Sequence, residues 1–249
     1  MTLTSKVSPA SFLLSFALLC GTALGCQCVD HLRTPYQEFD DAAIVFTGRV
    51  VRHRDKVIDE PNNVIERTFI FMVEEAFKNA NSKEIEINVG FTNSICYQGF
   101  HPKPLHLVYA RKNSVGEFWT AMCSRTFVAG PSDAYYLQRK LRGEKEAKLY
   151  GSVSGIDRLS RDELKRSSIV AEQVGGRKFT SPIDKSGRFS FSDLPNGEYN
   201  IALVTPVAKS ELGEGYRILL GDSESIGTAG GIRKSAYLSF AIDRKLTNF

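Results

Sequence analysis

Four cysteines beyond the apolar N-terminal stretch carry the clearest chemistry in this sequence: Cys26, Cys28, Cys96 and Cys123. In an exported chain they would form two disulfides, and three connectivities are possible. A Cys26–Cys28 bridge would close a ring over one residue, which conflicts with disulfide geometry. Either remaining pairing ties the N-terminus to segments roughly 70 and 95 residues further along. Each bridge would contribute on the order of 4 kcal/mol of stability by the loop-entropy model.

The other chemically able residues do not form a catalytic set. A Gly-Asp-Ser stretch at 221–223 is typical of an esterase nucleophile, but no histidine follows Ser223 to act as its base. The histidines are scattered, at His31, His53, His101 and His106, without a metal-binding or catalytic spacing. A zinc site of four cysteines would need two close pairs, whereas Cys96 and Cys123 lie far apart. We therefore predict a protein that is not an enzyme and has no cofactor.

The first 25 residues predict export. They contain one charge, Lys6, then an apolar run at 12–19 and the small-residue ending Ala23-Leu24-Gly25. This is the pattern of a secretory signal peptide at 1–25, cut before Cys26. No later stretch approaches the ~20 apolar residues of a spanning helix. We expect a secreted or periplasmic protein, with a lipid anchor on Cys26 as the less favoured alternative.

The charge pattern argues against a nucleic-acid partner. The chain has 32 Lys and Arg against 28 Asp and Glu, a net charge of +4. The charges are spread along the sequence, and its short basic clusters are interleaved with acidic or helix-forming residues. Solvated surfaces explain such clusters better than a site for a polyanion.

The hydrophobic pattern of residues 26–145 predicts a small barrel that would position the cysteines. Helices are expected over 35–42 and 131–143, the second capped by Ser132 with Ala134, Leu137 and Leu141 on one face. Five strands are expected, at 43–52, 65–77, 84–91, 105–112 and 117–123. This set fits a partly open five-stranded OB-fold barrel with peripheral helices. The polar stretch 143–148 would end this domain.

Residues 148–243 predict a second, purely β domain. Short strands alternate with turns rich in Gly, Asp, Asn and Pro, a texture typical of a β-sandwich of the prealbumin or Ig type. Phe189 and Phe191 should face its core. The charged stretch 156–167 should be a surface loop with one or two helical turns. The seven expected strands lie within 148–155, 167–174, 177–184, 187–194, 197–206, 215–221 and 236–243.

The cysteine spacing, together with the stretch CQCV at 26–29, resembles the tissue inhibitors of metalloproteinases and, more broadly, the netrin-like (NTR) module. Further matching blocks are 42–51, 106–110 and 123–126. The resemblance covers about 26–145 and implies the pairing Cys26–Cys96 and Cys28–Cys123. Residues 148–206, and less clearly 207–243, look like the carboxypeptidase regulatory-like (transthyretin-like) sandwich through GRFSFSDLPNGEY. That module is usually structural or an accessory for binding.

The resemblance implies a zinc metalloprotease as partner, contacted by Cys26, Gln27, Cys28 and Val29. In the inhibitor family the amine and carbonyl of the first cysteine bind the protease's catalytic zinc. A catalytic zinc keeps one position for water, which such a chelate can take. Position 27 is Gln where the family commonly has Thr or Ser. Burying the Gln27 amide without partners would cost roughly 1–3 kcal/mol.

Two functions of different classes follow from these observations. The leading prediction is a secreted metalloprotease inhibitor in which Cys26 binds the partner's zinc in trans. The alternative is a non-inhibitory exported binding or structural module that combines an NTR domain with a β-sandwich. A lipoprotein anchored at Cys26 would be a form of this alternative.

Overall fold

The computed structural model describes residues 33–94, 97–122, 124–129, 131–206, 216–220 and 235–241. Strands are the most abundant element in this part of the chain, so the predicted mainly β class is confirmed. The predicted signal segment, at 1–25, lies outside the described residues, as do all four cysteines of the expected disulfides. Among the helices that are described, none is long and apolar enough to cross a membrane.

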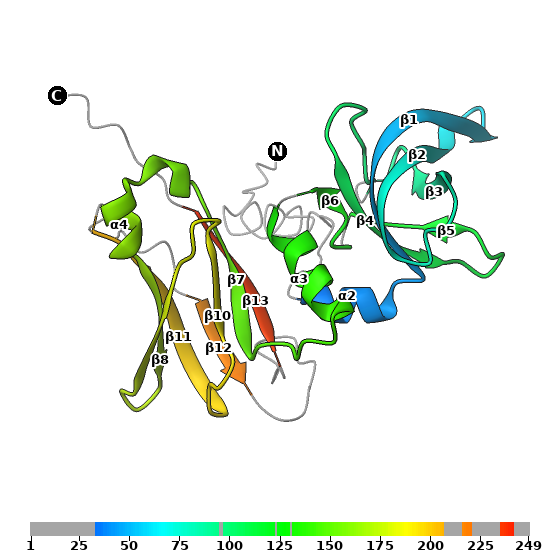
Figure 1. The fold of residues 1–249 in the computed structure, drawn as a ribbon. Helices are drawn as coiled ribbons and strands as arrows, with labels where there is room; N and C mark the ends of the chain where they lie inside the picture. Colours follow the sequence, from blue (N-terminus) through cyan, green and yellow to red (C-terminus); the bar gives the residue numbers. More distant parts are fainter. Residues whose placement is uncertain are drawn as a thin grey trace, which may run out of the picture.

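Five strands of the first part close into a ring (Figure 1). The strand order is β1-β2-β3-β5-β4, and β4 pairs back onto β1. All pairings in the ring are antiparallel except β3–β5. A short sixth strand, β6, pairs with the first two residues of β4. The strands are β1 (Ile44–Asp59), β2 (Val64–Lys78), β3 (Glu84–Phe91), β4 (His106–Lys112), β5 (Phe118–Trp119) and β6 (Phe127–Val128).

Phenylalanine rings fill the interior of the ring. Phe71 on β2 packs edge-on against Phe46 on β1 and against Phe100, with ring centroids 5.7 and 5.1 Å apart. Alternate residues of β3 point into the same core, where Ile87 is fully buried. Four register shifts between β1 and β2 bend this long hairpin around the core.

His106 at the start of β4 is the buried histidine of the described chain. Its Nε2 lies 2.8 Å from the carbonyl oxygen of His101, so Nε2 carries the proton and donates. Its Nδ1 is buried without a partner. The rings of Phe71 and Phe100 pack edge-on against the imidazole. Burial lowers the pKa of His106, because a charged ring would be poorly solvated there.

This buried imidazole predicts a loss of stability in mild acid. The folded pKa of His106 lies below the unfolded value of about 6.5, so its contribution is complete above pH 6.5 and is lost as pH falls below it. We expect the urea midpoint to fall between pH 7.5 and 5.5, and to fall less in His106→Gln. His101→Asn, which keeps its backbone carbonyl, should retain the wild-type dependence. An equal fall in His106→Gln would contradict this assignment.

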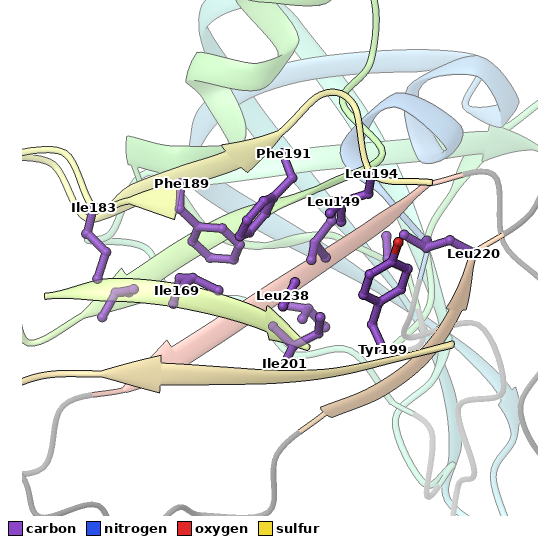
Figure 2. Packing of buried hydrophobic residues seen from close by; sticks show 13 residues of the cluster. Leu149, Ile169, Ile183, Phe189, Phe191, Leu194, Tyr199, Ile201, Leu220 and Leu238 are labelled. Atoms are coloured by element: carbon purple, nitrogen blue, oxygen red, sulfur yellow. The ribbon is translucent and has the colours of Figure 1, made fainter. Parts of the chain in front are cut away.

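The second part of the chain consists of two sheets that face each other. One has the strand order β10-β7-β13 and the other β12-β11-β8-β9. Figure 2 shows Phe189 and Leu238 from the first sheet and Tyr199 and Ile201 from the second within one core. We call this part, residues 149–241, the two-sheet part. Its strands are β7 (Leu149–Ser154), β8 (Ser168–Gln173), β9 (Lys178–Pro182), β10 (Arg188–Phe191), β11 (Gly197–Val204), β12 (Tyr216–Leu220) and β13 (Ala236–Ala241).

The parallel strands β7 and β13 lie close together at Gly151. Gly151 is the register partner of Leu238. A Cβ placed on Gly151 would lie 1.8 Å from the carbonyl oxygen of Leu238. The two backbones can therefore pair at this distance only because residue 151 has no side chain.

The helices lie where they were predicted, although two details of α3 were wrong. Helix α2 (Pro35–Asp41) begins at a capping box in which Thr34 and Gln37 bond each other's backbone amides. Helix α3 (Pro131–Leu141) begins before Ser132, so Ser132 is not its cap. Leu141 is 54% exposed because the helix ends there, whereas Leu137 is fully buried. The stretch at 156–167 forms a 3-10 turn, η1 (Ile156–Arg158), and a short helix, α4 (Arg161–Lys165).

A group of tyrosines joins the ring to the two-sheet part. Tyr36 on α2, Tyr136 on α3 and Tyr150 on β7 are buried in one cluster. The Tyr136 hydroxyl donates to the carbonyl oxygens of Gly151 and Phe189, at 3.0 and 3.1 Å. In Figure 1, α2 and α3 accordingly lie between the ring and the two sheets. The predicted division into domains at 26–145 and 148–243 remains a prediction, and this buried contact crosses it.

Candidate functional site

The predicted protease-binding residues Cys26, Gln27, Cys28 and Val29 lie outside the described residues, as do Cys96 and Cys123. The structure does describe chain on the C-terminal side of each cysteine-bearing segment. These stretches begin at Arg33, Tyr97 and Ser124. Their mutual contacts define the candidate site.

Arg125 brings two of these stretches together. Its Nη1 donates to the carbonyl oxygen of Arg33 at 2.9 Å. Its Nε and Nη2 donate to the carboxylate of Asp133 on α3, at 3.1 and 2.7 Å. Both side chains are largely buried, with 14% of Arg125 and 2% of Asp133 exposed. Burial lowers the pKa of Arg125, whereas the Asp133 carboxylate and, to a lesser extent, Tyr109 and Tyr237 raise it; the net pKa is raised, so the guanidinium stays charged.

Hydroxyl groups hold the stretch after Cys123 against β4. Thr126 Oγ1 accepts from the Tyr109 backbone amide and donates to the Tyr109 carbonyl oxygen, both at 2.9 Å. Thr120 Oγ1 lies 3.0 Å from the same carbonyl oxygen and 2.7 Å from the Ser124 hydroxyl. These side chains replace the backbone partners that Tyr109 lacks between β5 and β6. The third stretch joins here, because Gln98 Nε2 donates to the Thr126 carbonyl oxygen at 3.4 Å.

Thr126→Val tests this replacement of strand hydrogen bonds. Valine keeps the shape of threonine but removes the hydroxyl, which leaves the Tyr109 amide buried without an acceptor. We expect the free energy of unfolding to fall by about 1–3 kcal/mol, measured by urea denaturation. Thr180→Val, at an exposed position on β9, should change it by less than about 0.5 kcal/mol. Equal stability of the two variants would contradict the role given to Thr126.

A buried carboxylate on α2 forms an ion pair with the arginine that begins the first stretch. Glu38 on α2 is buried and lies 3.3 Å from Arg33 Nε and 3.4 Å from Arg111 Nη2. Arg33 also pairs with Asp41 at the end of the same helix. Charged contacts therefore fix residue 33 from both α2 and Arg125.

The structure does not bring the described histidines together as a site. His53 is exposed on β1, whereas His106 contacts the backbone of His101 rather than its ring. Among the described residues, no group of three or more His, Cys, Asp or Glu could hold a metal ion. His31 and the Gly-Asp-Ser stretch at 221–223 lie outside the described residues.

A cleft lies between the β1–β2 hairpin and residues 97–102. This cleft of about 560 Å³ has an aromatic floor that includes Phe69 and Phe100. Its arginines are already paired: Arg52 bonds Glu84 at 2.7 Å and Arg67 bonds Asp55 at 2.6 Å. The cleft therefore offers no free arginine to an anionic ligand.

Sequence reasoning did not single out Arg125, Thr126 or Asp133, although the first two lie within the matching block 123–126. An arginine followed by threonine after a cysteine is the signal that could have drawn attention to them. Comparison with known proteins adds no further guide, because no protein-family model matches the chain and no curated protein matches it either.

Proposed function

We propose that this chain is a secreted inhibitor of zinc metalloproteases that binds the protease's catalytic zinc through the amine and carbonyl oxygen of Cys26. The observation that carries the proposal is the approach, at one edge of the ring, of the three described stretches that follow the cysteines. Arg125 contacts the Arg33 carbonyl oxygen, and Gln98 contacts the Thr126 carbonyl oxygen. Two disulfides at this edge would hold the N-terminus against a rigid barrel.

The described contacts leave enough chain for these disulfides. Cys123 precedes Arg125 by two residues, and Cys28 precedes Arg33 by five. A fully extended chain spans at most about 3.3–3.6 Å per residue, so Cys28 lies within roughly 18 Å of Arg33. A disulfide needs Cα atoms about 5.5–6 Å apart, which this reach permits. These distances permit either long-range pairing, and the choice of Cys28–Cys123 together with Cys26–Cys96 rests on the resemblance.

The chemistry proposed for Cys26 depends on the one position of a catalytic zinc that no protein ligand occupies. Such a zinc has three protein ligands and a water, and the water is the attacking group. An N-terminal amine and its own carbonyl can replace that water as a five-membered chelate. The amine binds only when neutral, and its ordinary pKa is about 7.7–8.0. A terminus that is already fixed also loses less conformational freedom on binding.

An added residue tests the mechanism directly. The mature protein, beginning at Cys26, is titrated against a panel of zinc metalloproteases beside a form with one extra Ala before Cys26. The extension moves the free amine away from the Cys26 carbonyl, so inhibition should be lost. A form with one extra Ala after Phe249 is the matched control and should inhibit like the mature protein. Equal potency of the two extended forms would rule the mechanism out.

The remaining outcomes also decide between the alternatives. A mature protein that inhibits no protease in the panel would favour a non-inhibitory binding module and contradict the proposal. The mass of the mature N-terminus bears on the lipoprotein alternative. A diacylglyceryl adduct on Cys26 would occupy its thiol and exclude the disulfide that is proposed to hold the chelating terminus in place.

Gln27 is expected to limit affinity for typical targets. By the resemblance, its side chain would enter the protease's main specificity pocket, where a buried amide without partners costs roughly 1–3 kcal/mol. Gln27→Thr should therefore lower the inhibition constant by about tenfold or more. The measurement is a competitive inhibition assay, with Gln173→Thr on β8 as a control that keeps residue 27 and the contacts of the candidate site. A weaker inhibitor after Gln27→Thr would show that the amide makes favourable contacts.

A further inference from the structure

Arg125 connects the start of the described chain to the two-sheet part as well as to α3. Its guanidinium lies 4.4 Å from the ring centroid of Tyr237, a residue of β13. The same guanidinium bonds the Arg33 carbonyl oxygen and the Asp133 carboxylate. A cation over an aromatic face is attracted by the ring, and more strongly where water is excluded. One buried cation therefore links residue 33 to the strand that ends the two-sheet part.

A second link joins Thr34 to the same part of the chain. The Thr34 hydroxyl donates to Glu146 Oε1 at 2.6 Å, and the Tyr150 hydroxyl donates to the same oxygen at 2.7 Å. Tyr150 lies on β7, next to β13. Burial is the main cause that raises the pKa of Tyr150, with Glu146 adding to it, so the phenol remains a donor at neutral pH.

Together the two links hold consecutive residues, 33 and 34, from the two-sheet part. Both links pass through a residue that lies outside the two-sheet part, Arg125 in one case and Glu146 in the other. Thr34 also caps α2, so its position sets the direction in which the chain enters that helix. Residues 26–29 precede this point by only a few positions.

We propose that Arg125 and Glu146 are positioning residues through which the two-sheet part holds residues 33–34, and thereby orients the N-terminal segment that inhibits. The inhibitory consequence rests on the proposed function, whereas the ordering of residues 33–38 does not. The two-sheet part then contributes to inhibition without touching the protease. Its contribution is to reduce the freedom that the segment would lose on binding.

Hydrogen exchange of the full mature chain tests the ordering without a protease. The amides of Gln37 and Glu38 bond to Thr34, at 3.2 and 3.0 Å, and report whether it is fixed. In Tyr237→Leu, which removes the ring under Arg125, both amides should exchange about tenfold faster. In Tyr150→Phe, which removes one hydroxyl, they should exchange about fivefold faster. The β4 amide of Val108 should be unchanged in both variants.

Matched controls separate this effect from a general loosening. Tyr135→Leu removes an aromatic side chain whose ring centroid lies 3.8 Å from the Arg188 guanidinium. This is another contact between α3 and the two-sheet part. Tyr199→Phe removes a hydroxyl that donates to Pro195 within the two-sheet part. Neither control should speed exchange at residues 37–38. If Tyr237→Leu does not fold, Tyr150→Phe decides the result.

Inhibition constants for the same variants complete the test. They should rise by about tenfold for Tyr237→Leu and stay at the wild-type value for both controls. Unchanged exchange at Gln37 and Glu38 in Tyr150→Phe would overturn this inference even if the wild type inhibits. Faster exchange in a protein that inhibits nothing would support the ordering and refute the proposed function instead.

Discussion

Gly151→Ala should lower the free energy of unfolding by about 3 kcal/mol or more, because the new methyl group would overlap the backbone of the paired strand. The new Cβ would lie 1.8 Å from the Leu238 carbonyl oxygen and 2.8 Å from its carbonyl carbon. Both are backbone atoms of the paired strand β13, so no side-chain rotation relieves the overlap. The strands must separate, which also displaces the Gly151 carbonyl oxygen from the Tyr136 hydroxyl.

Two probes locate this damage. The chain's single tryptophan, Trp119, lies on β5 of the ring, so its fluorescence reports the ring, while circular dichroism reports all the strands. We expect urea denaturation to begin in the dichroism signal before the fluorescence signal. Gly99→Ala is the control, because its Cβ would meet only Tyr97 at 3.4 Å. Wild-type stability of Gly151→Ala would refute the close approach of β7 and β13.

Asp133→Ala should destabilise the protein by about 3–5 kcal/mol, because it leaves the buried Arg125 guanidinium without its carboxylate. Removing both charges in Arg125→Met with Asp133→Ala should cost less than the single substitution. Comparing the single and the double variant separates the free-energy cost of leaving Arg125 unpaired from the net stabilisation that the ion pair provides. The measurement is the free energy of unfolding at neutral pH.

A pair of lesser burial provides the control for this cycle. Asp40 is paired with Lys140 at 2.8 Å, and 64% of the Asp40 side chain is exposed. Asp40→Ala should change stability by about 1 kcal/mol or less, because water screens an ion pair whose carboxylate is largely exposed. A double variant that is less stable than Asp133→Ala would show that Arg125 stabilises by contacts other than the ion pair, such as those to Arg33 and Tyr237.

Apolar alternation predicted the strands well wherever one face is buried. The strand expected at 84–91 coincides with β3, whose Ile85, Ile87 and Val89 alternate with exposed residues. The strand expected at 43–52 continues to Asp59, because β1 pairs with β2 along its whole length. The stretch beyond residue 52 is mostly charged and faces water on both sides. Backbone pairing and contacts such as Arg67–Asp55 extend it without an apolar signal.

The candidate site was less predictable because its contacts join distant segments. Nothing local to Arg125 indicates that its partners are Arg33, Asp133 and Tyr237. The strand expected at 117–123 ends at Trp119, since the next residue, Thr120, uses its hydroxyl to bond the Tyr109 carbonyl. Where side-chain hydroxyls take the place of a pairing strand, the sequence shows no alternation of apolar and polar residues. Tyr136 was equally unpredictable, because helical spacing shows a second apolar face but not what covers it.

The parallel pairing of β7 with β13 sets an order of events during synthesis. β7 opens the two-sheet part, and its partner β13 is the final strand of the described chain. Three-stranded pairing around β7 can therefore be completed only after β13 has left the ribosome. Because Tyr237 is carried by β13, the stacking on Arg125 forms last as well. Residues 33–34 are thus held in place through a strand made roughly 200 residues later, and a nascent chain lacks that support until β13 has been synthesised.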